Sequence, residues 1–302
     1  MKNLIVPLGA KVVTRAELRG HDGRLLHPKG ALGMVVETPA DSTHAYRVQF
    51  PDGAVASLTR REFTIRALYQ VEGIAAALAE HDLYEYVIYR CIVGSRAYGL
   101  SHDDSDTDYR GIYLPPAELL WSLTGVPEQL ESPETEEAYW ELQKFLLLAL
   151  KANPNILECL YTPLVELATP PAQELLAMRE CFLSKLIYQT YNGYVMGQFR
   201  KLEQDLRAHG TIKWKHAMHL IRLLISGVIA LTEGYILVQQ DAYREALLTI
   251  RRGAMPWEEL NAWRLELHRE FDAAYASTRL PDRPDYDRVN RFLIKARRSM
   301  VR

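Results

Sequence analysis

Cysteine is scarce in this chain of 302 residues. The three cysteines, Cys91, Cys159 and Cys181, stand far apart, and none belongs to a Cys-x-x-Cys pair. An odd number without metal-ligand spacing argues against both a disulfide framework and a zinc site. We therefore expect the three thiols to serve as small hydrophobic side chains in a reducing compartment.

Long hydrophobic runs are also missing from the sequence. It contains no run of about eighteen apolar residues, and the N-terminal "MKNLIVPLGAKVVTR" has too short an apolar stretch for a signal peptide. There is no internal repeat and no low-complexity tract. With 48% hydrophobic and 25% charged residues, the composition is typical of a folded cytoplasmic protein without a membrane partner.

The net charge is only −2, but it is unevenly distributed. From Cys181 onward, 20 Lys and Arg stand against 13 Asp and Glu, an excess of seven positive charges. The preceding part carries 16 against 25, an excess of nine negative charges. This asymmetry is compatible with an anionic partner at the C-terminal half, although charge alone is a weak indicator.

The first part of the chain, residues 1–66, has an all-β pattern. Short β-branched runs such as "ALGMVVET" and "AYRVQF" alternate with the turn signals "HPKG" and "PDG". Four or five strands in such a short segment predict a small SH3-like β-barrel, a type of module that usually serves as an adaptor.

The remainder predicts an α+β architecture with two further domains, 67–170 and 171–302. Helical spacing over 63–82 precedes two strands, in "YEYVIYRCIVGS" and "DTDYRGIYLPP", and an apolar helix over 142–161 is expected to break at Asn153-Pro154. The segment "ATPPAQ" marks the domain boundary, and the pattern beyond it is helical almost to the end.

The stretch "CIVGSRAYGLSHDDSDTDYRG" places four aspartates directly after an apolar run. Asp106 and Asp108 are two apart, so in a strand both side chains point to one face. Two adjacent carboxylates repel each other unless a cation lies between them, and Mg²⁺ prefers carboxylate and phosphate oxygens. The preceding Gly94-Ser95 turn offers close backbone approach and N–H donors for phosphates. Together these features indicate a site for a nucleoside triphosphate.

This arrangement resembles the nucleotidyltransferases of the DNA polymerase beta superfamily, whose signature is Gly-Ser followed some ten residues later by two acidic residues one apart. The wording "GSRAYGLSHDDSDTDYRGIYLPP" is similar to a branch of RNA-ligase-associated, polymerase-beta-like proteins. Further matches are "ELQKFLLLALKANPNILECLYTP", "KHAMHLIRLL" and "IRRGAMP". The resemblance covers residues of about 70–300 and implies that 67–170 is a nucleotidyltransferase core and 171–302 a helical domain.

The superfamily usually adds a third carboxylate on a later strand. The matching position here is Glu136, which departs from the family's aspartate by one extra methylene. Glu137 and Glu134 are nearby alternatives, and a site without a third ligand is a further one. The resemblance therefore implies that Asp106, Asp108 and Glu136 are the catalytic and metal-binding residues, with Mg²⁺ or Mn²⁺ as cofactor.

By the same resemblance, the reaction transfers a nucleotide from a triphosphate such as ATP to an acceptor hydroxyl, with an RNA 3′ end as the favoured acceptor. Gly94 and Ser95 would hold the phosphates. The remaining predicted nucleotide-binding residues are basic: Arg96, Arg110, Lys215, His219 and Arg222. The last three recur at i, i+4 and i+7 and so share one helical face, which an ordinary solvated helix would also explain. Arg251 and Arg252 are weaker candidates of the same kind.

Several features have plainer explanations. The tyrosines at 188, 191 and 194 are expected to pack between helices rather than to stack on bases. His102 has no partner at metal spacing and is expected at the surface. Two other functions stay open: an RNA- or nucleotide-binding module that has lost turnover, and a metal-dependent phosphohydrolase that would release phosphate without an acceptor.

Overall fold

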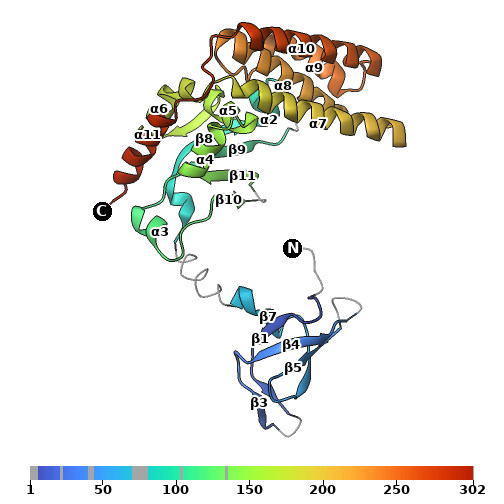
Figure 1. The fold of residues 1–302 in the computed structure, drawn as a ribbon, viewed down its shortest axis with the longest axis vertical. Helices are drawn as coiled ribbons and strands as arrows, with labels where there is room; N and C mark the ends of the chain where they lie inside the picture. Colours follow the sequence, from blue (N-terminus) through green and yellow to red (C-terminus); the bar gives the residue numbers. More distant parts are fainter. Residues whose placement is uncertain are drawn as a thin grey trace. The chain divides into compact units, whose positions relative to one another are not determined.

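A computed structural model describes residues 6–20, 23–39, 44–69, 81–102, 105–132 and 135–301. The chain folds into two compact units, Met1–Asp82 and Leu83–Arg302 (Figure 1). The mixed α+β class expected from the sequence is confirmed. The predicted border at residue 170 lies within the second unit and stays a prediction.

The first unit is built on a five-stranded antiparallel sheet with the order β6-β5-β4-β1-β7. Its strands are β1 (Lys11–Thr14), β4 (Leu32–Glu37), β5 (Tyr46–Gln49), β6 (Val55–Leu58) and β7 (Phe63–Ile65), and a separate ribbon pairs β2 (Leu18–Arg19) with β3 (Leu25–His27). The described strands leave β6 and β7 as the two ends of the sheet, so closure into a barrel is not confirmed.

The helix predicted over 63–82 begins later than expected. Phe63–Ile65 pairs with β1 as strand β7, and Phe63 is buried in the core of the first unit. Phe63 and Thr64 are both buried, and an aromatic residue followed by the β-branched Thr64 and Ile65 fits a strand better than a helix start. Helical backbone follows at 66–69, and residues 70–80 of the predicted helix lie outside the described residues.

The second unit has a mixed sheet with the order β10-β11-β9-β8-β12. Its strands are β8 (Val87–Val93), β9 (Asp108–Tyr113), β10 (Gln129–Ser132), β11 (Glu137–Glu141) and β12 (Val165–Ala168). Strand β9 pairs antiparallel with β8 and parallel with β11. A Cβ atom at Gly111 of β9 would lie 1.9 Å from the Tyr89 carbonyl oxygen, so only glycine allows this close pairing.

Helices cover the sheet and extend beyond it (Figure 1). They are α2 (Gly94–Ala97), α3 (Ala117–Trp121), α4 (Leu142–Ala149), α5 (Pro154–Tyr161), α6 (Pro170–Ala177), α7 (Leu186–His209), α8 (Trp214–Glu233), α9 (Arg244–Arg251), α10 (Trp257–Ser277) and α11 (Tyr286–Arg298). The predicted break at Asn153-Pro154 is confirmed: Asn153 Oδ1 accepts from the N–H groups of Asn155 and Ile156, and Pro154 takes the first helical position.

Helix α8 is the central helix of this unit, and it contacts α7, α9 and α10. It is long and apolar enough to cross a membrane by length and composition, but 67% of that apolar stretch is buried inside the protein. Its residues join those of β8, α4, α5 and α7 in one hydrophobic core. Burial in this core accounts for the apolar character of the helix.

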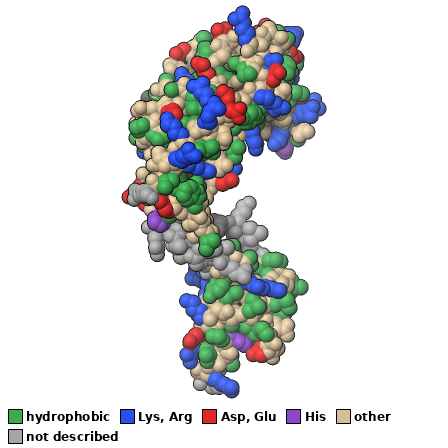
Figure 2. Space-filling view, turned by 60° about the vertical axis from the view of Figure 1, so that its left-hand side comes forward, with side chains coloured by type: hydrophobic (Ala, Val, Ile, Leu, Met, Phe, Trp, Pro, Cys, Tyr) green, Lys and Arg blue, Asp and Glu red, His purple; other side chains and the backbone are tan. Residues whose placement is uncertain are grey.

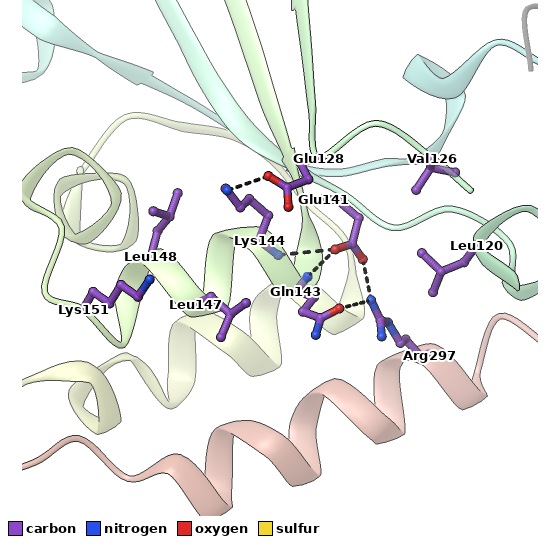
Figure 3. A pocket seen from close by; sticks show the side chains of 10 residues that line it. All are labelled: Leu120, Val126, Glu128, Glu141, Gln143, Lys144, Leu147, Leu148, Lys151 and Arg297. Carbon is purple, nitrogen blue, oxygen red and sulfur yellow. Dashed lines mark hydrogen bonds and ion pairs between the residues drawn. The ribbon is translucent and has the colours of Figure 1, made fainter. Parts of the chain in front are cut away.

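Helix α11 is held against α4 by polar contacts in a pocket of about 320 Å³ (Figure 3). Arg297 donates to Glu141 Oε1 at 3.1 Å and to the Gln143 side chain at 2.9 Å. Glu141 also caps α4, accepting from the N–H of Gln143 at 2.8 Å, and Lys144 pairs with Glu128 at 2.5 Å. These contacts join α11 to the start of α4, so the polar residues of this pocket position α11.

Candidate active site

A cavity of about 320 Å³ lies between the sheet and the helices of the second unit. It brings the Gly-Ser turn and both predicted aspartates together with cationic and imidazole side chains of α8 and α9. Its walls are formed by Gly94, Ser95, Tyr98, Leu100, His102, Ser105, Asp106, Asp108, Lys215, Met218, His219 and Arg251.

The Gly-Ser turn is where strand β8 changes abruptly into the single turn of α2. Gly94 makes this change with a φ of +71°, a backbone conformation that L side chains rarely adopt. A Cβ atom there would lie 2.7 Å from Asp108 Oδ2. The glycine therefore has two roles, because it allows the turn and it lets the backbone approach the carboxylate.

The two aspartates that line the cavity differ in secondary structure: one belongs to a strand and the other to the segment before it. Strand β9 begins at Asp108, whereas Asp106 is exposed and precedes the strand. The prediction that both lie in the strand is corrected in this detail, although both line the cavity. Arg96 donates to the Ser105 carbonyl oxygen at 2.8 Å and so holds the segment before Asp106.

The helical wall supplies cations. Lys215 and His219 lie one turn apart on α8, and Arg251 ends α9. Arg251 donates to the Leu100 carbonyl oxygen at 2.7 Å and its Nη2 lies 3.1 Å from His102 Nε2. His102, which the sequence predicts only as a surface residue, is exposed and also lines the cavity. His102 and Arg251 are far apart in the sequence, so no local motif predicts that they pair, and only the fold reveals it.

His219 is uncharged at neutral pH. Burial lowers its pKa to about 4, and the neighbouring positive charges of Arg222 and Lys215 act in the same direction. The imidazole can therefore donate and accept hydrogen bonds in the cavity without adding charge, and an anion bound nearby would raise its pKa.

Arg222 is buried rather than placed on the cavity wall. Its Nη1 lies 2.5 Å from Glu158 Oε1, and its guanidinium stacks 3.7 Å from the centre of the Tyr98 ring. Tyr98 donates its hydroxyl to Glu158 Oε2 at 2.7 Å. Burial, followed by the Glu158 charge, raises the pKa of Tyr98 and keeps it protonated. This geometry supports a structural role for Arg222 rather than the predicted phosphate contact.

Arg110 contacts the site from outside the cavity. Its Nη2 lies 3.5 Å from Asp108 Oδ1, and its Nη1 donates to the carbonyl oxygens of Tyr109 and Glu136 at 2.7 and 2.8 Å. Arg96, which is exposed, also donates to a backbone carbonyl oxygen. Both arginines hold the aspartate-bearing segment instead of lining the cavity.

The third carboxylate is not brought into the cavity wall. Glu136 is exposed in the turn before β11 and has a φ of +53°. Glu137 pairs with Arg90 at 2.9 Å, and because it lies opposite Tyr109 in the parallel ladder, it belongs to the sheet face away from Asp108. Glu134, like Asp103 and Asp104 of the aspartate loop, lies outside the described residues.

The remaining donor set suits a hard divalent cation that is shared with a substrate. Two carboxylates line the cavity next to a hydroxyl group, and Mg²⁺ is commonly held by one or two carboxylates together with phosphate oxygens and water. The described residues contain no cluster of three or more His, Cys, Asp or Glu side chains of metal-site type. Asp106 and Asp108 would therefore hold the ion together with the substrate.

Charged side chains of both signs cover the visible surface of the larger unit. Figure 2 shows Lys and Arg side chains spread over the visible face of the larger unit, with Asp and Glu side chains between them. This is the unit that contains the basic segment from Cys181 onward. The acidic residues of the cavity come from the sheet side and the cations from the helices.

The mixed α+β class, the Gly-Ser turn and the paired aspartates are those that the resemblance to polymerase-beta-like nucleotidyltransferases implies. Residues 68–295 match the RNA repair pathway DNA polymerase beta family, and the chain belongs to this family. The resemblance seen in the sequence is thereby confirmed. Residues 1–67 lie outside the match.

Part of the chain also matches a bacterial relative. The uncharacterized protein YcgL of Bacillus subtilis (strain 168) is 38% identical over 82 residues. The aligned segment covers 26% of this chain and 32% of YcgL, so the match spans about a third of that relative's length. No solved structure matches this chain.

Proposed function

We propose that the chain is a metal-dependent nucleotidyltransferase that moves a nucleoside monophosphate from a triphosphate to an acceptor hydroxyl and releases pyrophosphate. The observation that carries the proposal is the single cavity in which Gly94, Ser95, Asp106 and Asp108 meet Lys215 and Arg251. Carboxylates that hold a cation and basic groups that face phosphate are the two halves of a phosphoryl-transfer site.

In this reaction the acceptor oxygen attacks the α-phosphorus, and the bond from that phosphorus to the bridging β-oxygen breaks. Pyrophosphate leaves with the electron pair of that bond, and the hydroxyl proton passes to solvent. Asp106 and Asp108 would hold Mg²⁺ or Mn²⁺, and the ion would supply positive charge that offsets the negative charge of the reacting phosphates. Ser95 and the backbone at Gly94 orient the phosphates. Lys215 and Arg251 face the charge that builds on the departing pyrophosphate.

The acceptor we favour is an RNA 3′ end. The family description, which names an RNA repair pathway, and the basic helical part support it. ATP is one candidate donor, and the cytoplasm is the proposed location. The role of Glu136 as a third ligand, and of residues 1–66 as an SH3-like adaptor, stay predictions.

The test is pyrophosphate release and transfer of label into RNA. The full chain is incubated with Mg²⁺ or Mn²⁺, each α-labelled nucleoside triphosphate and total cellular RNA. Asp106→Asn and Asp108→Asn should each reduce transfer by at least 100-fold, whereas Asp287→Asn, an exposed aspartate of α11, should not. Release of phosphate without labelled RNA would instead identify a phosphohydrolase.

A binding module without turnover is the second candidate, because the described carboxylates in the cavity number two and Glu136 lies in an exposed turn. On that hypothesis RNA binding falls steeply with salt and is unchanged in Asp106→Ala. Measurable transfer by the wild type that disappears in Asp108→Asn would exclude it.

A further inference from the structure

A second cavity, of about 310 Å³, adjoins the candidate active site. The two cavities share Tyr98 and His219 as common wall residues. The second is also lined by Asn153 and Asn155 at the start of α5, and by Tyr194 of α7. A ligand bound at Asp106 and Asp108 in the first cavity could therefore extend into the second.

The second cavity differs from the first in charge. Its arginine, Arg222, is neutralised by Glu158 at 2.5 Å. Its two histidines are held uncharged at neutral pH, since burial lowers the pKa of His216 and, more strongly, that of His219. The first cavity thus concentrates charge, whereas the second offers neutral polar groups and an aromatic ring.

The groups of this wall are suited to a flat, uncharged ligand with hydrogen-bonding edges. Tyr194 is 48% exposed, although the tyrosines before it in α7 behave differently: Tyr191 is fully buried and Tyr188 stacks on Tyr275. Asn153 Oδ1 is occupied by the α5 cap, so the amide donor of Asn153 is the group left for a ligand. Arg222, another residue of this wall, is only 5% exposed, and its Nε is buried without a hydrogen-bond partner among the described residues.

We propose that the second cavity binds the nucleoside part of the donor triphosphate, with Tyr194 against the face of the base and the amides of Asn153 and Asn155 at its edge. This assignment rests on the proposed function, because it takes the triphosphate to lie in the first cavity. A neutral cavity beside a charged one matches a molecule with an uncharged nucleoside at one end and a polyphosphate at the other. Base stacking on an aromatic side chain contributes enough to be measured by substitution.

The experiment compares binding of each nucleoside triphosphate with binding of inorganic triphosphate, by calorimetry on the full chain with Mg²⁺. Tyr194→Ala should weaken binding of the preferred nucleotide about tenfold and leave inorganic triphosphate unchanged. Tyr194→Phe, which keeps the ring, should restore binding. Asn155→Ala should alter the ranking of the four bases, and Tyr235→Ala, a tyrosine of similar exposure outside the cavity, should change nothing.

Three results would overturn the assignment. The first is equal affinity of the wild type for nucleotides and inorganic triphosphate. The second is a Tyr194→Ala protein that loses both ligands equally or neither. The third is a Tyr194→Ala protein with unchanged nucleotide affinity but weaker binding of an RNA oligonucleotide. That result would indicate that the second cavity binds the terminal nucleoside of the acceptor.

Failure of the proposed function has a different signature. In that case the wild type would transfer no label into RNA and release no pyrophosphate, whatever the result of the binding titrations with Tyr194→Ala. Label transfer therefore tests the proposed function, and the loss of base discrimination in binding tests the second cavity.

Discussion

Replacement of Arg222 by methionine should strongly destabilise the larger unit, because it leaves the Glu158 carboxylate buried with the Tyr98 hydroxyl as its remaining partner. Arg222 and Glu158 are 5% and 2% exposed, and their charged groups lie 2.5 Å apart. Removal of one member of a buried ion pair typically costs about 3–5 kcal/mol in the free energy of unfolding. With a urea dependence of about 3 kcal/mol per molar, the unfolding midpoint should fall by about 1–1.7 M.

The assay is urea unfolding followed by tryptophan fluorescence. All five tryptophans, at 121, 140, 214, 257 and 263, belong to the larger unit, so the signal reports on that unit. Lys295→Met is the matched control: it breaks the pair of Lys295 with Glu174, and both of these side chains are largely exposed. Its effect should stay below about 1 kcal/mol.

A double variant separates the buried charge from simple loss of packing. Arg222→Met with Glu158→Leu removes both charges and should recover at least half of the lost stability, because no carboxylate is then buried alone. A midpoint shift for Arg222→Met no larger than that of Lys295→Met would refute the buried pair. It would also return Arg222 to the list of candidate phosphate ligands.

Two further predictions concern the candidate active site. Gly94→Ala should weaken metal-dependent nucleotide binding at least tenfold, because its Cβ would meet Asp108 Oδ2 at 2.7 Å. The control is Gly193→Ala in α7, which has open space around the new Cβ and should bind nucleotide normally. Equal affinities of the two variants in a calorimetric titration would contradict this prediction. For His219, the folded pKa of about 4 lies below the ordinary 6.5, so the unfolded chain binds the extra proton and stability falls as the pH drops from about 6.5 to 4. The loss in the free energy of unfolding should reach about 3 kcal/mol and be largely absent in His219→Gln. Urea unfolding across this pH range would measure it. An equal loss in His219→Gln would show that other groups cause the pH dependence.

Much of the candidate site could be predicted from the sequence because its residues are local. Gly94, Ser95, Asp106 and Asp108 fall within fifteen residues, directly after the β-branched run of residues 87–93 and at the start of the alternating polar and apolar pattern of "DTDYRGIYLPP". The start of α5 at Asn153-Pro154 is equally local, since an N-cap and a first-turn proline act through neighbouring backbone groups. For such features, chemistry and spacing are enough.

Only the tertiary structure decided which of the predicted residues outside this segment line the cavity and which are buried in the core. Lys215, His219 and Arg222 share one face of α8, but the helix enters the core along its length, so Lys215 is exposed and Arg222 is buried against Glu158 of α5. The pairing of His102 with Arg251 depends in the same way on packing between distant segments. Helical periodicity specifies a face, whereas burial and partners along that face depend on what packs against it, and only the folded chain supplies those neighbours.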